Sequence, residues 1–166
     1  MTVVVADSSP LNYLALIKSI DLLRRLYRRI VVPQQVVLEL TDPAAPYEVR
    51  NWASALPGWV DVRSIPPSDD PALSHLDPGE QSAILLAQSE AGALLLIDDA
   101  AGRLEASRRG ILNTGTLGVL RAAALKDLVD LPSALARILE TNFRVSMTLV
   151  DDLLAEEAAR KRQRTE

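Results

Sequence analysis

The sequence lacks or nearly lacks several residue types on which active sites are built. It contains no cysteine, so disulfides, thiolate metal sites and cysteine nucleophiles are excluded. The single histidine, His75, excludes a metal centre made of several histidines. Only six of the 166 residues are aromatic, too few for a surface on which RNA bases stack. No apolar run approaches a membrane span and no basic segment precedes residues 3–5, so we expect a cytoplasmic protein without signal peptide or membrane anchor.

The rest of the composition is that of a folded globular protein. Hydrophobic residues make up 48% of the chain and charged residues 24%, and the length suits one domain with a single core. The net charge is −4, so any binding of nucleic acid must depend on local basic patches. We expect a domain over residues 1–145, with a C-terminal helix and charged tail over residues 146–166 packed on it.

Short apolar segments alternate with segments of helical periodicity. Strands are predicted at residues 3–6, 30–32, 59–65 (an edge strand), 93–97 and 111–112. Helices are predicted at residues 10–17 (capped by Ser9), 21–30, 33–40, 47–56, 78–91, 100–109, after Thr114, at 133–141 and at 148–162. This alternation predicts a three-layer α/β/α sandwich with a central parallel sheet.

Two of the buried strands are followed directly by carboxylates. Asp7 follows the first strand, and Asp98 with Asp99 follows the fourth. Parallel strands end at one edge of the sheet, where acids so close together would repel unless a cation neutralised them. Oxygen ligands suit Mg²⁺ or Mn²⁺. For Asp99, capping of the next helix is an equal alternative.

Two further acids have structural explanations of their own. Asp77 and Glu80 have the spacing of a capping box, with Pro78 at the first helical position, so the sequence alone favours a structural role for Glu80. Glu39 lies at the border of an apolar helix stripe and would by itself be a partly solvated residue. Asp7 has no such explanation, because Ser9 is the predicted cap of the helix that follows it.

Taken in order, these segments resemble the PIN-domain family of metal-dependent ribonucleases, in its VapC-like toxin branch. The resemblance covers residues 2 to about 145, and its specificity lies in the order of four segments. They are VVVADSSPL (3–11), VPQQVVLEL (32–40), LDPGE (76–80) and LLLIDD (94–99). The chain departs from many members by Glu80 in place of aspartate and Ile97 in place of threonine, and its tail beyond Phe143 has no clear counterpart in the shorter toxins.

The resemblance implies a metal-dependent endoribonuclease, the toxin of a type II toxin–antitoxin pair. Asp7, Glu39 and Glu80 match the first three acids of the family, and Asp98 or Asp99 the fourth, with Asp99 favoured. Asp7 would bind Mg²⁺ or Mn²⁺ directly, Glu80 and Asp99 or Asp98 would complete the metal site, and Glu39 would bind through water or orient the nucleophile. Family members commonly pair with a small antitoxin and often dimerise, so both are expected partners beside the RNA substrate.

Three residues are candidate RNA contacts: Ser8, Arg103 and Thr116. Arg103 follows the acids of the fourth strand by one helical turn. Thr116, between Gly115 and Gly118, is placed where backbone amides and a hydroxyl could meet a phosphate, although the sequence favours a plain helix start at this position. Further candidates for phosphate contacts are Arg108 with Arg109 and the arginines at positions 24, 25, 28 and 29, although such clusters are more commonly solvated faces. The second set is equally suited to docking a partner.

The main alternative is a PIN-like regulatory protein that binds RNA or a partner without cleaving. Loss of a metal-binding acid would favour it, and all the candidate acids are present. Phosphotransfer folds fit less well, because the dehalogenase-type phosphatases need Asp-x-Asp after the first strand where this chain has Asp7-Ser8-Ser9. Receiver domains carry their acid pair after the first strand, and here the pair follows the fourth.

The C-terminal helix is expected to be stable and peripheral. Glu156 with Arg160, and Glu157 with Lys161, have the spacing of helical ion pairs. Its predicted apolar side consists of Leu149, Leu153 and Leu154, and its last residues are expected to fray.

Overall fold

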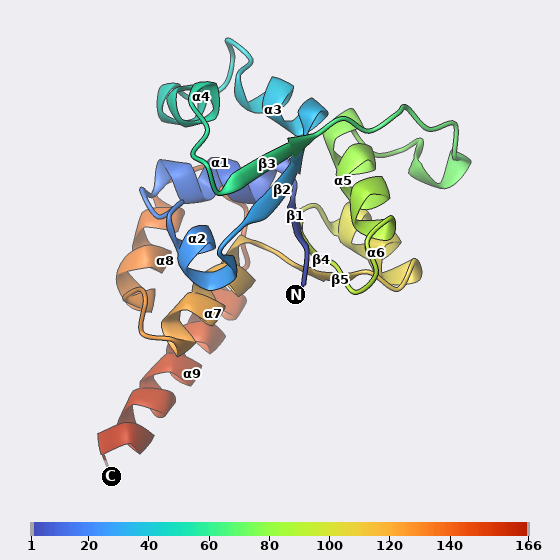
Figure 1. Cartoon of the computed structure of the whole chain (residues 1–166). Coiled ribbons are helices and arrows are strands. Elements are labelled where there is room, and N and C mark those ends of the chain that lie inside the picture. Colours follow the sequence, from blue (N-terminus) through green and yellow to red (C-terminus); the bar gives the residue numbers. More distant parts are fainter. Residues whose placement is uncertain (1, 166) are drawn as a thin grey trace.

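A five-stranded parallel sheet forms the centre of the computed structural model, which describes residues 2–165 (Figure 1). The strands are β1 (Val4–Ala6), β2 (Ile30–Pro33), β3 (Val60–Arg63), β4 (Leu94–Leu96) and β5 (Leu112–Thr114). Their order is β3-β2-β1-β4-β5, and all neighbouring pairs are parallel. The order reverses between β1 and β4, and in open parallel sheets the crevice at such a point is where ligands bind.

Helices connect the strands and cover both faces of the sheet. They are α1 (Ser8–Leu16), α2 (Leu22–Tyr27), α3 (Gln34–Leu40), α4 (Tyr47–Ser54), α5 (Pro78–Gln88), α6 (Ala100–Arg108), α7 (Thr116–Leu125), α8 (Leu131–Leu139) and α9 (Met147–Thr165), with a 3₁₀ turn at Pro71–Leu73. Within residues 2–165, none of these helices is long and apolar enough to cross a membrane.

The alternation of side chains along the strands divides the core in two. Val4 and Ala6 face one apolar cluster, to which α1–α4 and α7–α9 contribute, while Val5 faces a second cluster built with α5 and α6. Figure 1 shows α5 and α6 on the opposite side of the sheet from α2, α7 and α8. The predicted three-layer α/β/α sandwich is confirmed.

Several predicted boundaries differ from the structure by a few residues, and two of the differences have a clear local reason. Helix α1 begins at Ser8 with Asp7 in the N-cap position, so Ser9 is not the cap. The last strand begins at Leu112 because the Ile111 N–H closes the preceding helix by donating to the Ala106 carbonyl at 2.9 Å. Gly110, with φ of +73°, permits that reversal of the chain.

Helix α9 packs on the body of the protein along its length (Figure 1). Its N-terminal half contributes to the apolar core, and its C-terminal half is bonded to the end of α7, where Arg160 donates to the Ala124 carbonyl at 3.0 Å and Arg164 pairs with Asp127 at 2.8 Å. Leu153 is buried as predicted, but Val150 replaces Leu149, which is 46% exposed. Glu156 pairs with Arg121 of α7 at 2.7 Å instead of with Arg160, because α7 lies alongside. Arg160 pairs with Glu157 instead. The helix continues to Thr165.

Candidate metal centre

Asp7 lies at the carboxyl end of the central strand β1, with only 2% of its surface exposed. Its backbone N–H donates to the Leu96 carbonyl of β4 at 2.9 Å, which joins the ends of the two strands at the reversal point of the sheet. Its Oδ1 is buried and has no hydrogen-bond partner among the described residues. Burial raises the pKa of Asp7 well above its ordinary value, the Ser8 N–H opposes this, and the charges of Asp77, Glu80 and Glu39 add to it.

Glu39 reaches the same region from α3, the helix that follows β2. Its Oε1 accepts a hydrogen bond from the Gly79 N–H at 2.9 Å, so the first turn of α5 orients the carboxylate. Gly79 leaves room for this contact, because a Cβ at that position would overlap the Glu39 carboxylate. Burial raises the pKa of Glu39, Asp77 raises it further, and the Ser8 hydroxyl and Gly79 N–H act in the opposite direction.

Glu80 and Asp77 form the predicted capping box at the start of α5. The Glu80 N–H donates to Asp77 Oδ1 at 2.8 Å, and the Asp77 N–H donates to Glu80 Oε2 at 3.2 Å. The pKa of Glu80 is nevertheless raised to about 7, first by burial and then by the charges of Asp77 and Asp99. The structural explanation of Glu80 is therefore correct, and the same carboxyl also belongs to a group of acids that repel one another.

Asp98 is fixed between α1 and α7. The Ser9 hydroxyl donates to Asp98 Oδ2 at 3.0 Å, and Thr116 donates its N–H to Oδ1 and its hydroxyl to Oδ2, each at 2.7 Å. Thr116 is fully buried, and a Cβ at Gly115 would lie 2.6 Å from Asp98 Oδ1. The amide and hydroxyl that we considered for an RNA phosphate are thus bonded to a carboxylate of the protein itself.

Asp99 has the predicted capping role. Its Oδ2 accepts from the Gly102 N–H at 2.9 Å, so it caps α6. It is exposed, and its charge reaches Glu80. Of the two acids after β4, Asp99 therefore shares the electrostatic environment of the α5 acids, whereas Asp98 links helices.

The acid cluster comprises Asp7, Glu39 and Glu80, whose pKa values are raised, together with Asp77 and Asp99, whose charges contribute to raising them. The carboxylates are not closed around a single point: within residues 2–165, no three His, Cys, Asp or Glu side chains form a ready-made metal site. The donor chemistry nevertheless fits a divalent cation, because every donor is a carboxylate oxygen and the most buried one lacks a partner.

Sequence reasoning missed Asp77 as a member of this cluster, and the bonds of Ser9 and Thr116 to Asp98. The capping-box spacing placed Asp77 beside Glu80, but only the fold brings both to Asp7. Of the predicted RNA contacts, Ser8 is half-buried beside Glu39, and Arg103 is exposed with its Nε donating to Asn113 Oδ1 at 3.3 Å.

Comparisons with known proteins identify the family of the chain. A family model described as PIN domain (DUF3368) matches residues 3–158. Among solved structures, a PilT N-terminus domain protein from the hyperthermophilic archaeon Sulfolobus solfataricus P2 is 17% identical, with a TM-score of 0.43, over 88% of this chain and 100% of that one. No curated protein sequence matches. The family model extends past residue 145 into α9 and spans nearly the whole chain, and the chain therefore belongs to the PIN-domain family.

Proposed function

We propose that this protein is an endoribonuclease that depends on Mg²⁺ or Mn²⁺, and the toxin of a type II toxin–antitoxin pair. PIN domains are generally nucleases and typically use divalent metals, and the chain belongs to that family. The proposal specifies RNA as the substrate and the acid cluster as the place of reaction.

The buried carboxylate of Asp7 is the observation that carries the proposal. Burying a carboxylate with an unpartnered oxygen is unfavourable, and three further acids near it increase the cost. Asp7 occupies the N-cap position of α1, but its side chain makes no capping hydrogen bond there. A divalent cation would offset the burial and the repulsion together.

The chain's own residues would divide the work between binding and orientation. Asp7, Glu80 and Asp99 would hold the ion, with Asp98 as the alternative to Asp99. The ion, when bound, would acidify a water molecule and neutralise charge on the phosphate. Glu39, which Gly79 orients and whose pKa is raised, would hold that water and accept its proton at a carboxylate oxygen.

Contacts outside the acid cluster would hold the RNA strand. Arg103 is exposed one turn after Asp99 on α6, a suitable place for a cation that binds a phosphate next to the reacting one. Ser8 lies beside Glu39 and could donate to the same strand. Thr116 would contribute indirectly, by keeping Asp98 in place.

A small antitoxin protein is the proposed partner, and a second copy of this chain is a further one. Arg24 and Arg25 of α2, and Arg28 and Arg29 after it, are exposed and form a basic surface for an acidic segment. A growth assay tests the pairing. Expression of this chain should arrest growth, Asp7→Asn should not, and co-expression of the neighbouring small reading frame should restore growth.

Cleavage of single-stranded RNA by the purified full-length chain tests the activity. We expect cleavage with Mg²⁺ or Mn²⁺, none in EDTA, and none by Asp7→Asn, which keeps the shape of the side chain and removes the anionic ligand. Asp151→Asn is the matched control, because Asp151 is exposed on α9. Equal cleavage by Asp7→Asn, or cleavage in EDTA, would contradict the proposal. Absence of cleavage with RNA binding intact would favour the non-catalytic alternative.

A further inference from the structure

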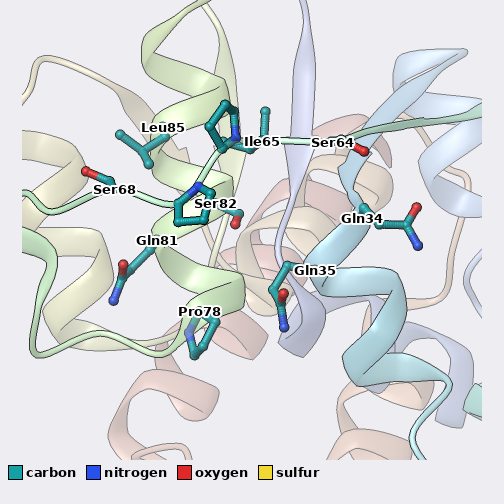
Figure 2. Close-up of a pocket in the computed structure, with 11 residues that line it drawn as sticks. Gln34, Gln35, Ser64, Ile65, Ser68, Pro78, Gln81, Ser82 and Leu85 are labelled. Atoms are coloured by element: carbon teal, nitrogen blue, oxygen red, sulfur yellow. The ribbon is translucent and has the colours of Figure 1, made fainter.

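A pocket of about 420 Å³ lies between the first turns of α3 and α5 and the segment that follows β3 (Figure 2). Its size falls in the range of roughly 300–1,000 Å³ that is usual for sites of small ligands. Gln35 enters it from α3, Ile65 from the segment after β3, and Pro78, Ser82 and Leu85 from α5. The acids of the metal centre are absent from its lining.

The lining of this pocket contains no charged side chain. It therefore offers no cation to hold a phosphate and no carboxylate to hold a metal ion. It combines amide and hydroxyl groups with apolar walls from Ile65 and Leu85. Such a lining suits a flat, uncharged group with hydrogen-bonding edges, whose faces lose water against the walls while its edge meets polar groups.

The pocket adjoins the acid cluster through the seam between α3 and α5. Gln35 precedes Glu39 by one helical turn on α3, so their side chains project from the same side of the helix. Pro78 is next to Gly79, whose N–H bonds to Glu39. A phosphodiester held at the acid cluster would thus have a neighbouring nucleotide within reach of the pocket.

From this arrangement we propose that the pocket binds the base of a nucleotide flanking the scissile phosphate, with Gln35 contacting the base edge. The inference rests on the proposed ribonuclease activity and adds a determinant of sequence preference to it. A glutamine amide offers a donor and an acceptor side by side, the combination that reads base edges. Ser82 would add a hydroxyl beside it.

The other glutamines are less suited to this role. Gln81 already donates its Nε2 to the Leu76 carbonyl at 2.9 Å. In Figure 2 the side chain of Gln34 extends away from α5, whereas that of Gln35 lies near Pro78, between the two helices. Gln35 is accordingly the residue to change.

Nucleotide binding to the isotope-labelled full-length chain, measured by NMR without metal, tests the inference. The probes are the four ribonucleoside 5′-monophosphates, with ribose 5-phosphate as the ligand that lacks a base. We expect nucleotides to shift the Gln35 side-chain amide signals and one base to bind most tightly. Gln35→Ala should weaken the binding of that nucleotide by about 3–10-fold, which corresponds to the loss of one or two hydrogen bonds. Gln163→Ala, an exposed glutamine on α9, should leave binding unchanged.

Ser82→Leu supplies a second variant, because a larger side chain should fill the pocket and abolish binding. A thermal melt shows whether Ser82→Leu folds. If Ser82→Leu does not fold, the result with Gln35→Ala tests the inference by itself. Ribose 5-phosphate binding as tightly as the nucleotides, no binding at all, or equal binding by Gln35→Ala would overturn the inference. Since no metal or cleavage is needed, failure of the nuclease proposal would appear separately, as uncut RNA.

Discussion

The Asp7 carboxylate lowers the stability of the metal-free protein. A carboxylate at the end of a buried strand with an unpartnered oxygen adds unfavourable desolvation and repulsion, and a neutral side chain of the same shape would fit that place better. Residues that reduce stability in this way are typical of functional sites. The same reasoning yields a stability prediction that needs no substrate.

We expect Asp7→Asn to raise the thermal stability of the metal-free protein, by an amount on the order of 1 kcal/mol, because it removes one of the charges that repel one another. Differential scanning calorimetry in EDTA measures this. Asp151→Asn, in an exposed position, should change the melting temperature little. Destabilisation by Asp7→Asn in EDTA would mean that the carboxylate has a structural role.

Gly79 allows the close approach that orients Glu39. We expect Gly79→Ala to displace the Glu39 carboxylate and to reduce RNA cleavage at least about tenfold, while the gain in helix propensity keeps the protein folded. Gly58→Ala is the matched control, because a Cβ at Gly58 meets nothing within 4 Å. Unchanged cleavage by Gly79→Ala would show that the position of Glu39 is unimportant.

Each element around the sheet edge delivers one part of the site. Asp7 directly follows strand β1, α3 carries Glu39, and the start of α5 supplies Asp77 as its N-cap and Glu80 in its first turn. The N-terminus of α7 holds Asp98 through Thr116. The site is therefore built from a strand end, the last turn of α3 and the starts of α5, α6 and α7, which meet at one edge of the parallel sheet.

The sequence indicated the strand-end acids because apolar runs followed by aspartate are local patterns. The layers of the sandwich were predictable for the same reason. The position of Asp77 was not, since a capping box looks the same wherever its helix packs. The face of α9 was mispredicted at Leu149 because leucine spacing does not reveal which side meets α7 and α8. The ion pair of Glu156 likewise depends on Arg121, 35 residues away.

Helix α9 contributes to stability without contacting the acid cluster. Leu153 is 9% exposed and packs in the larger core cluster, so Leu153→Ala should lower the free energy of unfolding by about 2 kcal/mol. Leu149→Ala should lower the free energy of unfolding far less, because Leu149 is 46% exposed. Urea denaturation measures both. RNA cleavage by folded Leu153→Ala should match the wild type, and similar costs for the two variants would contradict this packing of α9.

At the scale of the whole molecule, the two halves of the sheet meet between β1 and β4. Asp7 follows β1 at this junction, and the charges of the other acids act on it there. Folding without a cation brings negative charges together, so the stability of the protein should depend on pH and on divalent ions. Three acids outside the cluster have pKa values shifted in the opposite direction. Hydrogen bonds and salt bridges lower the pKa values of Asp127, Asp130 and Glu157.

We expect the metal-free protein to lose stability as pH rises from about 4.5 to 7. The pKa of Glu80 is about 7 in the folded state against an ordinary value of 4.5, so the folded state binds more protons in this window. The stability that Asp127, Asp130 and Glu157 contribute is lost at lower pH. Thermal melts across this range measure the slope. Glu80→Gln, which can keep the capping box, should flatten it, and a stability that rises with pH throughout the window would contradict the expectation.

Equilibrium Mn²⁺ binding to the full-length chain, followed by electron paramagnetic resonance, tests the central claim that the acid cluster is a metal centre. We expect saturable binding by the wild-type protein and by Asp151→Asn, with Asp7→Asn weaker by about tenfold or more because its anionic ligand is gone. Binding by Asp7→Asn that equals the wild type, or no saturable binding by the wild-type protein, would contradict the account.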